Sequence, residues 1–189
     1  MKKAILFICF VLVLGITCLC AQTADNPAIK TIINNFGARN YSTEAVTKAE
    51  LDLIIQAGIR APSASNRQPW HFTVIQNQTL ARQILSQSSE GNVVIVVSGA
   101  GDNRTNGQVV LDCSLAVQSM YLAAQALGLG SRIYTNPINN INSRYKADLG
   151  LPDNYNAVAV IRIGRLAPGV DAVSSASPRN SADRTVTYK

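Results

Sequence analysis

The chain has 189 residues, of which 47% are hydrophobic and 15% are charged, and its formal net charge is +6. This length and apolar content are enough for one globular domain with its own core. The 17 Lys and Arg residues are scattered along the chain instead of clustered, which argues against a nucleic-acid-binding protein.

The N-terminal segment, residues 1–21, has the pattern of a secretory signal peptide. Lys2 and Lys3 precede an uncharged apolar run that ends in small residues near Cys20. The run is slightly short for a membrane span, which needs roughly 20 apolar residues. We therefore expect residues 22–189 to form an exported, periplasmic domain with no stable membrane insertion after cleavage. An uncleaved anchor and a lipid-anchored envelope protein are the alternatives.

Signal removal changes the charge and the cysteine content of the chain. The mature part keeps 15 basic and 11 acidic residues, a net charge of +4, and its single cysteine is Cys113. An exported protein with one thiol has no internal disulfide, so a hydrophobic core must hold the fold together.

The predicted elements of the mature chain alternate between helices and strands. A first helix is expected at residues 47–59, opened by a capping box of Thr47 and Glu50. Residues 71–76 and 92–98 have strand patterns, and the second is apolar on both faces, which predicts a central strand. A short helix is expected between them, at residues 78–87. The longest helix follows at residues 107–130, with Gly128 or Gly130 as its stop, and then a further helix at 138–149 and a last strand at 156–164.

The C-terminal tail, residues 165–189, is rich in Ser, Ala and Pro and too polar to make a core of its own. No linker separates two apolar blocks in the mature chain. We therefore expect one α+β domain built around a small sheet.

Several kinds of active site are excluded by the residues that the mature chain lacks. His71 is its only histidine and Cys113 its only thiol, so multi-histidine and cysteine zinc sites are excluded. No G-x-S-x-G elbow is present for a serine hydrolase. The run "SGAGDNRTNG" resembles a dinucleotide-binding loop, but Arg104 occupies the third glycine position, so we interpret it as a loop only. Cys113 is expected to be a core residue and not a nucleophile.

Four segments in chain order resemble motifs of the FMN-dependent nitroreductase family. They are "APSASNRQPW" (61–70), "DCSLAVQSMYLAAQALGLGS" (112–131), "LGLPDNYNAVAVIRIGRLA" (149–167) and "PRNSADRTV" (178–186). The resemblance implies a nitroreductase-like fold, with a small mixed β-sheet flanked by helices and two chains intertwined in a homodimer. It also implies FMN as the cofactor, NAD(P)H as a possible electron donor, and a nitroaromatic, quinone or similar small molecule as the acceptor.

The family's flavin-contacting loop corresponds to residues 62–68, which the resemblance assigns to the other subunit of the dimer. Its candidate cofactor-binding residues are Pro62, Ser63, Ser65, Asn66 and Gln68. The amides can donate to and accept from the polar edge of the isoalloxazine ring, and the hydroxyls can bind ring or ribityl oxygens. Turn formation alone is the alternative role of these side chains.

The FMN phosphate requires cations, and the resemblance assigns Arg39 and Arg179 to this role. Family members usually carry an Arg and a Ser where this chain has Asn35 and Gly37, so one charge and one hydroxyl are missing. Arg179 is then expected to carry more of the phosphate binding, with Arg39 on the phosphate or on the ring edge. Either arginine could instead be a solvated surface charge.

The family also places a backbone N–H near the flavin N5 atom, at the position of Thr135 or Asn136 in this chain. Such a donor stabilises charge that develops at N5 during hydride transfer. The side chains at these positions are unusual for the family, so only the backbone role carries over. Arg132 in the same segment faces either the ligand or the solvent.

The predicted signal peptide leaves the electron donor open, because NADH and NADPH are scarce outside the cytoplasm. Two other function classes remain from the sequence. One is a flavin-using enzyme of different chemistry, such as reductive dehalogenation or flavin fragmentation, and the other is a non-catalytic FMN-binding envelope protein.

Overall fold

The computed structural model describes residues 25–101, 106–175 and 177–189. Its contacts divide the chain into two units, Met1–Asn35 and Phe36–Lys189. The described part of the first unit contains helix α2 (Pro27–Ile33), which Asn26 caps through its side chain. The predicted signal peptide and Arg104 of the glycine-containing loop lie outside the described residues.

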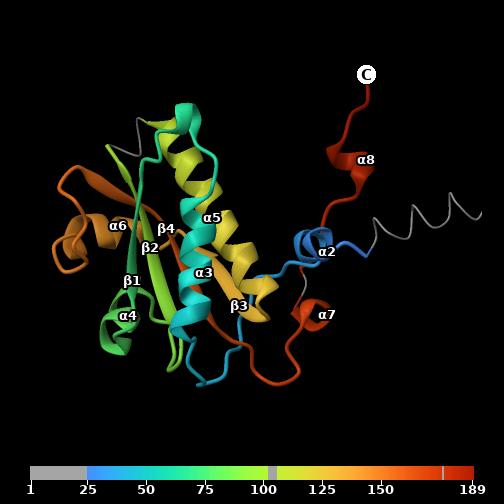
Figure 1. Ribbon diagram of the computed structural model, residues 1–189, viewed down its shortest axis with the longest axis horizontal. Helices are drawn as coiled ribbons and strands as arrows, with labels where there is room; N and C mark the ends of the chain where they lie inside the picture. Colours follow the sequence, from blue (N-terminus) through green and yellow to red (C-terminus); the bar gives the residue numbers. More distant parts are fainter. Residues whose placement is uncertain (1–24, 102–105, 176) are drawn as a thin grey trace, which may run out of the picture. The chain divides into compact units, whose positions relative to one another are not determined.

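The second unit is built on a four-stranded sheet in the order β1-β2-β4-β3 (Figure 1). The strands are β1 (Trp70–Ile75), β2 (Val93–Ala100), β3 (Leu129–Tyr134) and β4 (Tyr155–Arg165). Central strand β2 is paired from Val93 to Ala100 with β4 and is buried over almost its whole length, as its two-sided apolar pattern predicts.

The α+β fold is confirmed, but the expectation of a mixed sheet is wrong for the described residues. All three pairings, β1 with β2, β2 with β4 and β3 with β4, are antiparallel. The reason lies in helix α5 (Gly107–Ala126), whose 20 residues run back along the sheet for about 30 Å. The chain therefore starts β3 at the end of the sheet where β2 also starts, and β4 runs between them in the opposite direction.

Helices cover both faces of the sheet. Helix α3 (Lys48–Ile59) packs beside α5 on one face, over a core that includes Ile54, Ile95 and Met120 (Figure 1). The other face packs against α4 (Gln78–Ile84) and the segment formed by α6 (Ile138–Asn140) and the π-turn η2 (Ile141–Tyr145). Each fully buried Ile or Leu contributes about 1.5–3 kcal/mol relative to exposure, so these two cores account for most of the favourable energy of the fold.

Most predicted elements are confirmed with shifted ends. Helix α3 begins with the predicted capping box, in which the Thr47 hydroxyl accepts from the Glu50 N–H and the Glu50 carboxylate accepts from the Thr47 N–H. The longest helix ends at Ala126, and Gly128, one of the two glycines expected to stop it, follows the C-cap residue with a φ of 75°. The residues after it form strand β3, which the sequence pattern did not reveal. Of the described helices, α5 is long and apolar enough to cross a membrane by composition, yet its buried face packs in the core of this unit.

The tail is polar and exposed, as expected. It holds two short helices, α7 (Ala172–Ser175) and α8 (Ala182–Thr185), neither of which has a buried residue. The tail therefore makes no core of its own.

Candidate functional site

The loop between α3 and β1 has an unusual backbone. It contains a short 3-10 turn, η1 (Ala64–Asn66), and three of its non-glycine residues have positive φ: Ser65 at 52°, Asn66 at 54° and Gln68 at 47°. Left-handed backbone costs a non-glycine residue energy and persists only where the surroundings enforce it. Three such residues within four positions indicate a loop that is held in a required shape.

Two side chains hold this loop. The Ser63 Oγ accepts a hydrogen bond of 2.9 Å from the Gln68 N–H and so closes the loop on itself. The Asp112 Oδ1 atom, on α5, accepts one of 3.1 Å from the Ala64 N–H. Gln108, one turn earlier on α5, donates to the same Asp112 oxygen at 3.0 Å.

The predicted polar groups of the loop lie at its surface. Pro62, Ser65, Asn66 and Gln68 are exposed, and Ser63 is half-buried. The Gln68 amide donates to the Asn66 Oδ1 atom at 3.2 Å, which fixes the two amide side chains against each other. The loop therefore presents ordered amides to solvent.

A second segment, residues 36–41, carries Arg39 along the start of β3. The Gln125 side chain, on α5, pairs with both backbone groups of Phe36: its Oε1 accepts from the Phe36 N–H and its Nε2 donates to the Phe36 carbonyl, each at 3.1 Å. The Ala38 N–H donates to the Ser131 carbonyl at 3.0 Å. The backbone of this segment is thus fixed, while the Arg39 side chain is exposed and forms no ion pair with the described residues.

A buried arginine, Arg162, contacts the Arg39 segment. Arg162 is only 4% exposed, and its guanidinium lies 4.2 Å from the centre of the Tyr41 ring. It donates to the Arg39 carbonyl at 3.4 Å and also to the Gln87 carbonyl. Burial raises the pKa of Tyr41 to about 12, against the opposing effect of the Arg162 charge.

The other predicted residues lie at the end of β3 and in the tail. Thr135 and Asn136 are exposed, directly after β3, and the Thr135 carbonyl accepts from the Ile138 N–H at 3.2 Å. Arg132, for which two roles were open, is half-buried and lies over the Tyr134 ring at 5.5 Å. Arg179 is exposed and donates to the Ser177 carbonyl at 3.3 Å.

The charge of Arg179 also affects the pKa of a tyrosine on α5. Burial raises the pKa of Tyr121, while a hydrogen bond with Gln125 and the charge of Arg179 act in the lowering direction. The charge of Arg179 therefore acts on the same half of α5 that holds the Arg39 segment.

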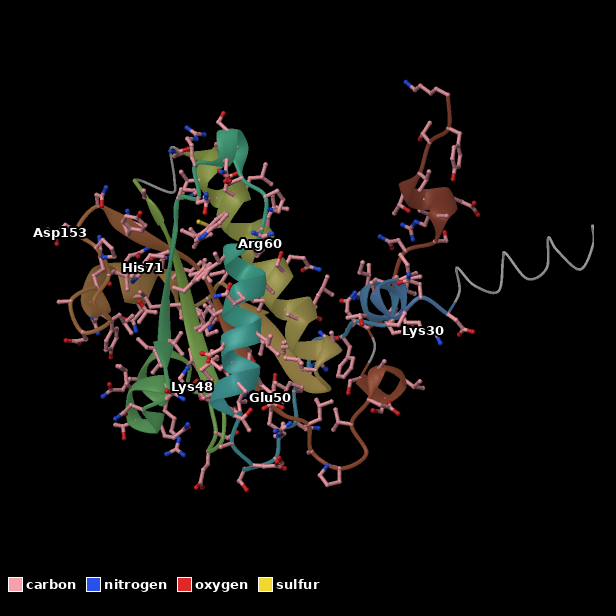
Figure 2. The ribbon with its side chains drawn as sticks, viewed as in Figure 1. Lys30, Lys48, Glu50, Arg60, His71 and Asp153 are labelled. Atoms are coloured by element: carbon pink, nitrogen blue, oxygen red, sulfur yellow. The ribbon has the colours of Figure 1, made fainter. Side chains whose placement is uncertain are left out.

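Within one chain the two halves of the predicted site lie far apart. Asp112, which holds the loop, and Gln125, which holds the Arg39 segment, are 13 positions apart on α5, or about 20 Å along the helix. Figure 2 shows Arg60, where the loop starts, at one end of α3 and Glu50 at the other, and Glu50 binds Arg165 next to the Arg39 segment. The structure thus brings Arg39 and Arg179 toward one end of α5 and leaves the loop at the other.

Cys113 and His71, the single thiol and the single imidazole among the described residues, are not paired as a catalytic dyad. Cys113 is a buried free thiol whose pKa burial raises to about 12, with the neighbouring Asp112 charge adding to the effect, so its predicted core role is confirmed. His71 is half-buried at the start of β1, edge-on to the Tyr155 ring at 6.1 Å (Figure 2). Trp70 is partly buried against the core and stacks with Phe72, so it anchors the start of β1 to the core.

Sequence reasoning missed three residues that hold the site segments, namely Asp112, Gln125 and Arg162. Asp112 follows Val109 by three positions on the apolar face of the longest helix, so an acidic residue inside that face was a usable signal. Arg162 interrupts the apolar run of strand β4 in the same way. Gln125 carried no comparable signal, because glutamine is ordinary in a helix.

The sequence model of the Nitroreductase family matches residues 38–95 and 89–165. The chain belongs to the nitroreductase family. A protein of Archaeoglobus fulgidus, provisionally named NADH dehydrogenase/NAD(P)H nitroreductase, is 29% identical over 147 residues, which are 72% of this chain and 83% of the relative. The family implied by the sequence motifs is therefore confirmed, and the motif at residues 178–186 lies outside the matched residues.

Two crystal structures of similar fold contain FMN. The nitroreductase of Bacteroides fragilis with bound FMN superposes with a TM-score of 0.72 at 22% identity and covers 87% of this chain and 99% of its own, a likeness that shows the fold alone. A provisionally named nitroreductase of Desulfovibrio desulfuricans in complex with FMN reaches 0.73 at 28% identity, with coverage of 87% and 98%.

Proposed function

We propose that this nitroreductase-family chain is an FMN-dependent oxidoreductase that passes electrons from a reduced donor, such as NAD(P)H, to a nitroaromatic, a quinone or a similar acceptor. The observation that carries the proposal is the loop Ser63–Gln68, with three left-handed residues and ordered surface amides, in a chain of this family. FMN-bound relatives of the same fold support the choice of cofactor.

The exposed polar groups of the loop, of the Arg39 segment and of the tail fit the chemistry of FMN. The Asn66 and Gln68 amides can both donate and accept, as the alternating carbonyl and N–H groups of the flavin edge require. Arg39 and Arg179 are exposed and form no ion pair with the described residues, so both charges are available to a phosphate. Bound FMN would supply the redox chemistry, and the protein supplies placement and electrostatics.

The protein groups have separate tasks in this proposal. The loop amides hold the polar edge of the ring, and the two arginines hold the phosphate end. The backbone N–H of Thr135 or Asn136 is the candidate donor near N5, where it would stabilise developing negative charge. None of these tasks needs a paired acid and base or an activated nucleophile, which agrees with the raised pKa of Cys113.

A homodimer forms part of the proposal. The loop and the Arg39 segment are about 20 Å apart along α5 in one chain, so a single FMN is expected to take the loop from one copy and the arginines from the other. Exposed apolar side chains support a contact on the α3 and α5 side, namely Leu53, Ile59, Leu111 and Leu115.

The proposed activity is tested by anaerobic reduction of the flavin-loaded protein with NADH, NADPH and dithionite, followed by mixing with a nitroaromatic or a quinone. We expect bleaching of the flavin absorbance by at least one donor and its rapid return with the acceptor. A flavin that dithionite bleaches but no acceptor reoxidises would instead indicate a binding protein.

Export is the remaining part of the proposal and rests on the sequence pattern of residues 1–21. Expression of the full chain in a bacterium with an outer membrane should give a periplasmic product that begins near residue 22. N-terminal sequencing of the periplasmic fraction measures this. Full-length protein retained in the cytoplasm would refute export. NADH and NADPH would then be available to the protein as electron donors.

A further inference from the structure

A buried carboxylate on α5 contacts the loop Ser63–Gln68. Asp112 is 1% exposed, on the core-facing side of α5. Its Oδ1 atom accepts from the Ala64 N–H and from the Gln108 side chain. Its Oδ2 atom is buried without a hydrogen-bond partner, and no cation pairs with the carboxylate among the residues that the structure describes.

This arrangement is a poor way to stabilise a fold. Burying a carboxylate costs free energy that is recovered only when a cation or several hydrogen bonds compensate the charge. Among the residues that the structure describes, nothing compensates the Oδ2 half of the Asp112 carboxylate, and alanine at this helical position would remove the buried charge and improve the helix propensity. The general stability of α5 therefore does not explain an aspartate at this position.

The loop, in contrast, needs support from outside. Its left-handed residues Ser65, Asn66 and Gln68 store backbone strain. The hydrogen bonds from Gln68 to Ser63 and from Asn66 to Ser63 act within the loop and do not fix its position on the fold. The hydrogen bond from the Ala64 N–H to Asp112 joins the middle of the loop to α5, and a charged acceptor makes it stronger than a neutral one.

We propose that Asp112 is a positioning residue of the flavin site, which anchors the loop Ser63–Gln68 through Ala64 and so keeps Asn66 and Gln68 in place for the cofactor. This inference rests on the proposed function for its link to FMN. The anchoring of the loop itself can be measured without any cofactor.

The test compares Asp112→Ala and Asp112→Asn with the parent protein and with Asp148→Asn, a control at an exposed aspartate. Amide hydrogen exchange of the FMN-free proteins should show about tenfold faster exchange at Ala64 in Asp112→Ala, with β2 and β4 unchanged. FMN affinity should fall about tenfold, as expected for the loss of one charge-assisted hydrogen bond. The melting temperature without FMN should stay the same or rise.

Asp112→Asn retains a neutral acceptor, so both changes should be smaller, about threefold. If Asp112→Ala fails to fold, this variant decides the question by the same two readouts. Unchanged exchange at Ala64 in a folded variant, or exchange that rises equally in β2 and β4, would overturn the proposal. Faster loop exchange with unchanged FMN affinity would overturn the link to the cofactor. A parent protein that binds no FMN would defeat the proposed function, while the exchange data would still test the anchor.

Discussion

At the scale of single residues, the proposed phosphate site depends on two exposed arginines. The resemblance places Asn35 and Gly37 where an Arg and a Ser are expected, so in the proposal Arg39 and Arg179 carry the charge. Gly37 has room for a serine, because a Cβ atom there would meet only the Arg132 Cγ at 3.8 Å. The missing hydroxyl at position 37 is therefore a property of this sequence and not a steric requirement of its fold.

Arg179→Ala should weaken FMN binding about ten- to a hundredfold, the worth of a charge-assisted hydrogen bond to a phosphate. Riboflavin, which lacks the phosphate, should bind the variant and the parent with similar affinity. Titration of the flavin fluorescence with both ligands measures this. Arg184→Ala removes an equally exposed charge from the same tail and should change neither affinity.

Equal losses for FMN and riboflavin in Arg179→Ala would show that the phosphate lies at another residue. Asn35→Arg should act in the opposite direction by restoring the absent charge. Both effects should shrink as salt is added, because exposed charges are screened.

The residues that sequence reasoning missed are polar side chains that bind backbone groups of other elements. The exposed residues of the loop could be found from the motif, since the motif is contiguous. Asp112 and Gln125 bind backbone groups of segments 48 and 89 positions away, and no local pattern contains such a partnership.

Gln125→Ala should lower the free energy of unfolding by about 2–3 kcal/mol, because the Phe36 N–H and carbonyl both lose their partner. Denaturant unfolding of the FMN-free protein measures the loss. Gln83→Ala, at an exposed position of α4, should stay within about 0.5 kcal/mol of the parent. Similar values for the two variants would mean that the pairing with Phe36 contributes nothing to the fold.

At the scale of elements, one ionic cluster joins the start of α3 to the end of β4. The Glu50 carboxylate accepts from Thr47 at the helix N-terminus and from the Arg165 guanidinium at 3.0 Å. The Thr47 backbone N–H, then its hydroxyl and Arg165, hold the pKa of Glu50 below its ordinary value of 4.5. These contacts favour the ionised form in the folded state.

The free energy of unfolding should therefore fall when the pH is lowered. A carboxylate with a depressed folded-state pKa contributes stability above its unfolded-state pKa, and loses it as the pH falls through the folded-state value. Glu50→Gln should show a smaller fall between about pH 6 and pH 3 than the parent protein. Asp52→Asn, on the same helix but in an exposed pair with Lys48, is the control and should follow the parent. A parent-like profile for Glu50→Gln would exclude the cluster as a source of acid sensitivity.

The elements with strong periodic patterns could be predicted, and strand β3 could not. Strand β2 has a continuous apolar run, and the capped helix α3 has apolar residues at helical spacing, and the sequence shows both patterns directly. Strand β3 has the residues Leu-Gly-Ser-Arg-Ile-Tyr, pairs with β4 on one side and lies at the edge of the described sheet, so pairing rather than local pattern makes it a strand. The antiparallel pairing likewise follows from the return path of α5, which no local signal contains.

At the scale of the whole molecule, the proposed site needs more than one chain. The family motif identified the residues of both halves, but their separation along α5 became visible only in the structure. This separation makes the homodimer a physical requirement of the proposal, because neither half alone offers both the ring-binding amides and the phosphate-binding cations.

The most direct test of the account is the binding of FMN by purified residues 22–189, the chain without its predicted signal peptide, measured by absorbance during analytical ultracentrifugation. The account predicts that the flavin absorbance sediments with the protein, at about one FMN per chain and at twice the mass of the monomer. A colourless monomer that stays so after addition of excess FMN would contradict it.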